Sequence, residues 1–90
     1  LVFVKFFISG TSNSTSTNFT LPYTAVNSTG SHSRDAIYVT NNGSTPATPG
    51  LGYTTPNDTV YRCYTDFNGA AWTNTGTKEV GGSFWFEATT

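Results

Sequence analysis

The carboxylates are the side chains of this sequence best suited to acid–base chemistry. Glycoside hydrolysis needs two carboxyl groups that face each other across a cleft, about 5–9.5 Å apart. Asp58 and Asp66 flank one predicted strand, so they converge only if the sheet curls. The simpler interpretation is that they end turns or pair with Arg62. We therefore predict that the chain is not an enzyme, whichever pair is chosen from its five carboxylates: Asp35, Asp58, Asp66, Glu79 and Glu87.

Metal-binding and nucleophilic chemistry find little support. The chain has one histidine, His32, in a turn rich in Ser and Gly, and one cysteine, Cys63, between aromatic residues in a predicted strand. One of each is too few for a zinc site or an internal disulfide. No phosphate-binding glycine loop or nucleophile elbow is present. We predict no metal and no cofactor, a solvated His32, and a Cys63 that acts as a small buried hydrophobe.

Sugar binding is the chemistry that the residue types favour. Flat aromatic rings stack on the CH groups of a sugar, while neutral amides and hydroxyls bind its hydroxyl groups. Trp72 lies in the predicted loop 70–76, and Tyr53 lies in a second loop that is rich in Pro and Gly. The alternative is that both rings plug the ends of the fold. The candidate ligand-binding residues are Trp72, Tyr53, Asn68, Asn74 and Asn57.

The composition narrows the class of protein that must position these residues. Only 10% of the residues are charged and the net charge is −1, which gives no electrostatic basis for binding nucleic acid. No stretch approaches the about 18 apolar residues that insert into a membrane. The chain holds 18 Thr, 9 Ser and 8 Asn, and 16% of it is aromatic. This balance is typical of a β-rich extracellular or virion-surface domain.

Short alternating segments separated by Gly, Asn and Pro predict an all-β fold. No segment shows a sustained 3.6-residue period. We expect one domain over residues 1–90, an antiparallel β-sandwich of jelly-roll type with five or six strands. Asn42-Gly43 predicts a tight turn. The expected strands are residues 1–8, 19–21 with an edge continuation over 23–27, 36–40, 60–67 and 83–88; the expected connections are a hairpin loop over 9–18, a turn over 28–34, a long loop over 44–59 and a turn-rich passage over 68–82.

The alternation also predicts which faces are buried. Residues 1–8 are apolar on both faces, so the strand should be covered on both sides, as it would be in an oligomer. Phe84 and Phe86 should face the core, whereas Trp85 belongs to the core or to a subunit interface. Lys5 interrupts the first strand. It either extends to solvent at an edge or forms an ion pair between chains with a carboxylate near the last strand, Glu87 or Glu79.

Three segments resemble a domain found at the C-terminal ends of bacteriophage tail-fibre and tail-spike proteins. Residues 1–12, LVFVKFFISGTS, are similar to the family's strand and following Ser/Gly/Thr-rich hairpin. Residues 19–25, FTLPYTA, resemble its "LP-aromatic-x-A" step, and residues 80–88, VGGSFWFEA, resemble its terminal strand. The order and spacing agree with the family. No motif of the family matches residues 27–57.

The resemblance implies a homotrimeric β-sandwich on the virion surface that binds host cell-surface polysaccharide and contacts other virion proteins. A structural role without a ligand, in trimerisation, a head fibre or capsid decoration, is the alternative. A third possibility is a domain that caps a depolymerase whose catalytic part lies elsewhere. Because the chain lacks Met and begins on a predicted strand, we expect it to be part of a longer protein. The resemblance implies that it is the C-terminal part.

Overall fold

The computed structural model describes residues 1–25 and 33–89, and the expected all-β class is confirmed. Of the edge continuation expected over residues 23–27, the described residues 23–25 form only an isolated bridge, between Ala25 and Ala88. Its remainder, the turn around Gly30 and His32 lie outside the described residues. The described part contains no helix, and therefore none that could cross a membrane. Its six strands are β1 (Val2–Thr11), β2 (Thr17–Thr20), β3 (Ser33–Asn41), β4 (Gly50–Thr54), β5 (Val60–Tyr64) and β6 (Thr77–Phe86).

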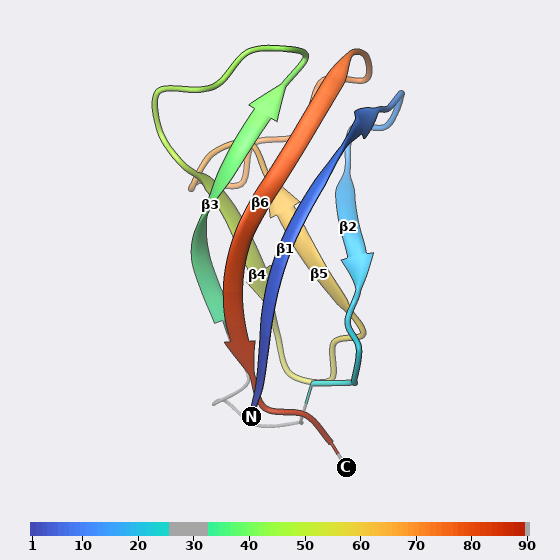
Figure 1. The fold of residues 1–90 in the computed structure, drawn as a ribbon, viewed down its shortest axis with the longest axis vertical. Helices are drawn as coiled ribbons and strands as arrows, with labels where there is room; N and C mark the ends of the chain where they lie inside the picture. Colours follow the sequence, from blue (N-terminus) through green and yellow to red (C-terminus); the bar gives the residue numbers. More distant parts are fainter. Residues whose placement is uncertain (26–32, 90) are drawn as a thin grey trace.

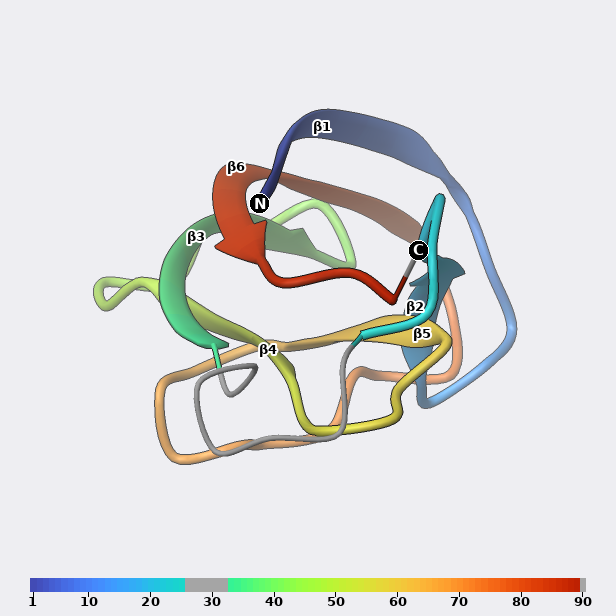
Figure 2. The ribbon, with the colours of Figure 1, turned by 90° about the horizontal axis from the view of Figure 1, so that it is seen from below.

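The six strands form one antiparallel sheet in the order β1-β6-β3-β4-β5-β2 (Figure 1). The sheet curls into a half-barrel, and the view along its long axis shows the strands as an incomplete ring (Figure 2). β3 makes the corner, because residues 33–37 pair with β4 and residues 38–41 pair with β6. The curl gives the molecule a concave inner face and a convex outer face.

The first and last strands pair along their whole length, from Val2 opposite Phe86 to Thr11 opposite Thr77. The hairpin expected over residues 9–18 is therefore wrong. β1 continues to Thr11, and β2 pairs with β5 at the other edge of the sheet. The connection from β1 to β2 crosses from one edge to the other instead of turning the strand back on itself.

Strand β4 was not expected, because residues 44–59 were predicted to be a loop. Pro and Gly usually interrupt a strand. Here the glycines are needed: a Cβ on Gly52 would stand 2.1 Å from the hydroxyl oxygen of Tyr61. The ring of Tyr61 lies across the inner face of β4 in the space that a side chain would fill.

Strand β6 also begins earlier than expected, at Thr77, and runs through Gly81 and Gly82 without a turn. A Cβ on Gly81 would stand 2.9 Å from Cδ1 of Phe7, and a Cβ on Gly82 would stand 3.0 Å from a methyl carbon of Ile37. Both glycines let a neighbouring side chain lie flat on the strand. The Asn42-Gly43 turn is confirmed, with φ of 52° and 79° at the two residues.

Aromatic rings fill the concave face. Tyr61 and Phe84 stack with ring centroids 3.8 Å apart and planes 11° apart. Phe6 of β1 and Phe19 of β2 meet at 4.9 Å, although their strands are the two edges of the sheet. Phe84, Phe86 and Cys63 are buried, as predicted, and so is Tyr61. The strand expected over residues 60–67 is shorter: β5 ends at Tyr64, and Phe67 beyond it is exposed.

Phe84 and Trp85 make a matched test of this arrangement. Phe84→Ala removes a fully buried ring and should lower the free energy of unfolding by about 3–5 kcal/mol. Trp85→Ala removes a ring that is more than half exposed in the single chain and should lower it by less than about 1 kcal/mol. Urea denaturation at low protein concentration measures both. Equal losses would show that the faces of β6 are assigned wrongly.

Candidate functional site

Trp72, the first of the predicted ligand-binding residues, lies in the core. Its side chain is 3% exposed, and the indole nitrogen donates a hydrogen bond to the carbonyl oxygen of Cys63 at 2.9 Å. A ring buried to this degree offers no face to a sugar. The geometry favours the alternative weighed for it, a packing role.

The three predicted amides are exposed but do not gather in one place. Asn57 lies in the turn between β4 and β5, with a left-handed φ of 64°. Asn68 and Asn74 follow the other end of β5, where the main-chain nitrogen of Asn68 donates to a carboxylate oxygen of Asp66. The predicted set therefore does not form one site.

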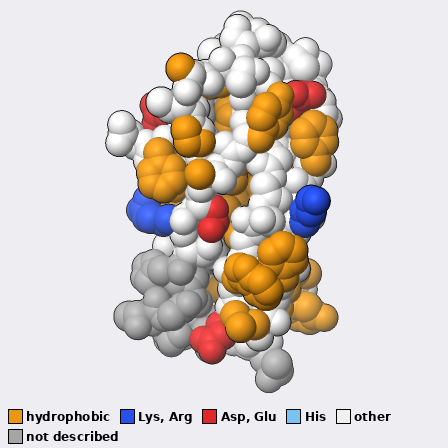
Figure 3. Space-filling model, turned by 60° about the vertical axis from the view of Figure 1, so that its left-hand side comes forward, with side chains coloured by type: hydrophobic (Ala, Val, Ile, Leu, Met, Phe, Trp, Pro, Cys, Tyr) orange, Lys and Arg blue, Asp and Glu red, His pale blue; other side chains and the backbone are white. Residues whose placement is uncertain are grey.

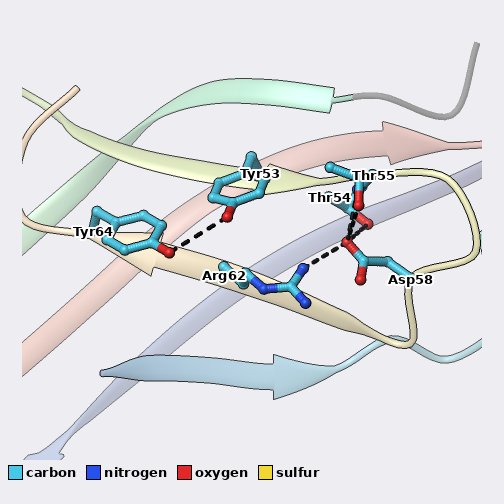
Figure 4. Close-up of polar contacts among 6 residues, drawn as sticks. All are labelled: Tyr53, Thr54, Thr55, Asp58, Arg62 and Tyr64. Carbon is cyan, nitrogen blue, oxygen red and sulfur yellow. Dashed lines mark hydrogen bonds and ion pairs between the residues drawn. The ribbon is translucent and has the colours of Figure 1, made fainter. Parts of the chain in front are cut away.

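Tyr53 belongs to a cluster that crosses the convex face. Because β4 is a strand, Tyr53 is the cross-strand neighbour of Arg34 on β3 and of Arg62 on β5. Its ring is nearly parallel to that of Tyr64, with centroids 5.6 Å apart and planes 8° apart. The two hydroxyl oxygens are 3.4 Å apart (Figure 4). We call Arg34, Tyr53, Arg62 and Tyr64 the tyrosine–arginine cluster.

Both arginines approach the ring of Tyr53. The guanidinium carbon is 5.3 Å from the ring centroid for Arg34 and 5.7 Å for Arg62, within cation–π range. Arg62 also pairs with Asp58 at 2.6 Å. Among the described residues no carboxylate pairs with Arg34. The cluster therefore presents aromatic surface together with one positive charge that no described carboxylate offsets.

Asp58 holds the Arg62 side of the cluster in place. One of its carboxylate oxygens accepts hydrogen bonds from the main-chain nitrogen of Thr55 at 2.7 Å, from the Thr55 hydroxyl at 2.9 Å and from Arg62 (Figure 4). Burial by itself raises the pKa of the carboxyl group, but the bonds from Arg62 and Thr55 outweigh it and hold the pKa below its usual value. The expectation that Asp58 ends a turn and pairs with Arg62 is confirmed.

The other titratable groups near the core have structural partners. Asp66 accepts hydrogen bonds from the main-chain nitrogens of two turn residues. Asp35 accepts a bond from the buried Tyr61 hydroxyl at 2.8 Å. Burial raises the pKa of the free Cys63 thiol to about 12, so the thiol stays protonated at neutral pH. No group of three potential metal ligands occurs within residues 1–25 and 33–89.

A second surface on the convex side is apolar. Phe3, Phe7, Tyr38 and Trp85 are 47–63% exposed, and we call them the aromatic face. Phe3 contacts Trp85 with ring centroids 4.6 Å apart. Phe7 of β1 stacks on Tyr38 of β3 with ring centroids 6.4 Å apart, across Gly81 of the intervening strand β6. The space-filling view shows exposed hydrophobic side chains in separate groups with largely uncharged surface between them (Figure 3).

Sequence reasoning missed Tyr64 and both arginines as partners of Tyr53, because it placed Tyr53 in a loop. The alternation of residues 60–67 did put Arg62 and Tyr64 on one face, which was the available signal. It also missed Tyr38, which the pairing of β3 with β6 brings beside Phe7. The chain matches no protein-family model, no curated protein and no solved structure.

The lowered pKa of Asp58 gives a pH prediction. A carboxyl group whose pKa is lower in the folded than in the unfolded chain stabilises the fold above its unfolded pKa, near 3.8, and loses that contribution as the pH falls through the folded pKa. The free energy of unfolding of Asp58→Asn should therefore fall below that of the unsubstituted chain at pH 5–7, by an amount that shrinks toward pH 2. Denaturation across this pH range measures it. A difference independent of pH would contradict the assignment.

Proposed function

We propose that this chain is a non-catalytic domain of a virion fibre or spike that assembles with two further copies of itself through the aromatic face. The exposure of Phe3, Phe7, Tyr38 and Trp85 on paired strands is the observation that carries the proposal. Apolar surface that a single chain leaves in water marks an interaction site, and aromatic residues are enriched in interfaces. In the assembly, this face of one sheet packs on a neighbouring copy as one layer of a sandwich.

The position of Lys5 favours a second copy of this chain as the partner. It is exposed between the two aromatic pairs, directly opposite Ser83 on β6. A lysine covered by an interface needs an acceptor from the other side. The carboxylates next to this face are Glu79 and Glu87, so a second copy would bring the acceptor that Lys5 needs. Such a pair fixes the register of the copies more than it adds affinity. The number of copies, three, comes from the resemblance to phage fibre domains.

A second candidate function, binding of host cell-surface polysaccharide, is supported by the tyrosine–arginine cluster. Two nearly parallel tyrosine rings offer flat surface for the CH groups of a sugar, while Arg34 and Arg62 offer donors for its oxygens. This is the site that we propose in place of Trp72. A surface of neutral hydroxyls and amides suits attachment outside the cell, because such contacts depend little on salt.

The assembly proposal predicts a change in mass. The double variant Phe3→Ser/Trp85→Ser should be folded and monomeric where the unsubstituted chain is a trimer, because both substitutions remove apolar surface only from the aromatic face. Sedimentation equilibrium measures the mass. Tyr23→Ser is the control, since Tyr23 is also exposed but is not part of that face. A trimer that survives the double substitution would contradict the proposal, as would an unsubstituted monomer.

The polysaccharide candidate predicts a loss of adhesion without a loss of assembly. Tyr53→Ala/Tyr64→Ala should reduce binding to susceptible host cells by about tenfold, since each aromatic contact contributes about 0.5–1.5 kcal/mol beyond the area it buries. Its mass should be unchanged, and Tyr23→Ala should bind normally. An intact assembly that binds no host cell would favour the alternative, a structural domain of a head fibre or capsid.

A further inference from the structure

A cavity opens between the two edge strands of the curled sheet. The rings of Phe6 and Phe19 meet across the gap between β1 and β2, and the cavity is lined by residues that follow Phe6 and precede Phe19. The cavity has a volume of about 440 Å³, within the range of small-molecule sites. Ile8 shows that it is open: its alternation places it on the inner face of β1, yet it is 43% exposed. The Ile8 and Val80 side chains give the cavity an apolar wall.

The rest of the lining consists mostly of hydroxyl groups. Ser12, Ser14 and Ser16 come from the connection between β1 and β2, and the hydroxyls of Ser14 and Ser16 are 3.3 Å apart. Thr17, the cross-strand partner of the inward-facing Cys63, adds a hydroxyl from the start of β2. This is a concave surface with many neutral donors and acceptors beside an apolar wall.

Lys78 brings a positive charge into the same cavity. Its side chain is 6% exposed, and its ammonium group donates to the carbonyl oxygens of Ser14 at 2.7 Å and of Ser12 at 3.2 Å. An ammonium group has three N–H donors, so one remains. No described carboxylate pairs with Lys78. Glu79 also borders the cavity, but its two oxygens accept hydrogen bonds from Ser9 and Tyr38 on the convex side.

Gly10 keeps the space beside Lys78 open. The two residues are direct partners in the pairing of β1 with β6, so a side chain at position 10 would project on the same side as that of Lys78. A Cβ built on Gly10 meets no atom within 4 Å. Glycine here therefore leaves room in the cavity, whereas Gly50 and Gly52 make room for neighbouring side chains.

We propose that this cavity binds an acidic saccharide, with the ligand's carboxylate on Lys78 and its hydroxyls on the Ser/Thr lining. A buried cation without a carboxylate partner is stabilised by an anion, and a charge-assisted hydrogen bond is stronger than a neutral one. One cation favours a monoanion. The hydroxyl-rich lining favours a polyhydroxylated ligand, and Ile8 and Val80 can contact the CH groups of its ring. The saccharide class rests on the proposed host-surface role; the carboxylate rests on the geometry alone.

Titration with sodium D-glucuronate, followed by NMR chemical shifts, tests the site in the assembled protein. Glucuronate should bind and shift the amide signals of residues 8–18 and 78–80. D-Glucose, which lacks the carboxylate, and sodium acetate, which lacks the sugar hydroxyls, should each bind at least about tenfold more weakly. Gly10→Val should weaken glucuronate binding by at least about tenfold by filling the cavity. Thr20→Val, which places the same side chain at an exposed position of β2 outside the cavity, should leave it unchanged.

Lys78→Met supplies a second variant that removes the charge and keeps the length of the side chain. Equal binding of acetate or glucose, or full binding by a folded Gly10→Val variant, would overturn the proposal. So would the absence of glucuronate binding. That result would leave the assembly proposal standing, because the mass of the protein and its adhesion to host cells are measured separately.

Discussion

The stacking of Tyr61 on Phe84 across the concave face is the contact on which the rest of the structure depends. The two rings come from β5 and β6, which lie on opposite sides of the curl, and Phe6 and Phe19 extend the same cluster to both edges of the sheet. Bringing Tyr61 into this position requires Gly52 beneath it, because any side chain there would occupy the space of the phenol. One aromatic cluster thus accounts for the curl of the sheet, for the glycines of β4 and for the contact of Phe6 with Phe19 between the two edge strands.

The same constraint explains what is left on the outside. In a sheet of this size the concave face holds few large side chains, and Tyr61, Phe84, Phe86 and Trp72 already fill it. The aromatic residues on alternate positions of β1, β6 and β3 point outward and stay exposed in the single chain. The tyrosine–arginine cluster occupies the convex side of the other strands. The molecule thus presents an apolar surface suited to assembly and a polar aromatic surface suited to a ligand.

The sequence predicted the elements whose alternation is uninterrupted. β1, β3, β5 and the second half of β6 overlap the segments expected to be strands, although β1 and β3 extend into an expected loop and turn and β5 ends three residues early. The burial of Phe84 and Phe86 on the inward face of β6 is as predicted. It did not predict β4 or the first half of β6, because glycine in a strand resembles a turn when the side chain that needs the space is far away in sequence. Because β4 was not predicted, the candidate site was not predicted either: Tyr53, Arg34 and Arg62 become neighbours only through strand pairing. The sequence left the role of Trp72 open between ligand contact and packing for a related reason, since the burial of a loop residue depends on tertiary contacts.

The central claim is that the outer surface of β1 and β6 is covered by copies of this chain, and the two tryptophans can test it within one sample. In protein labelled with 5-fluorotryptophan, Trp85 reports on the aromatic face and the buried Trp72 serves as an internal control. Fluorine NMR in H₂O and in D₂O measures the solvent exposure of each. The account predicts that the solvent isotope shift of Trp85 is large at high dilution and disappears as the protein concentration rises, while Trp72 stays unchanged. A Trp85 signal that remains exposed at every concentration would contradict it.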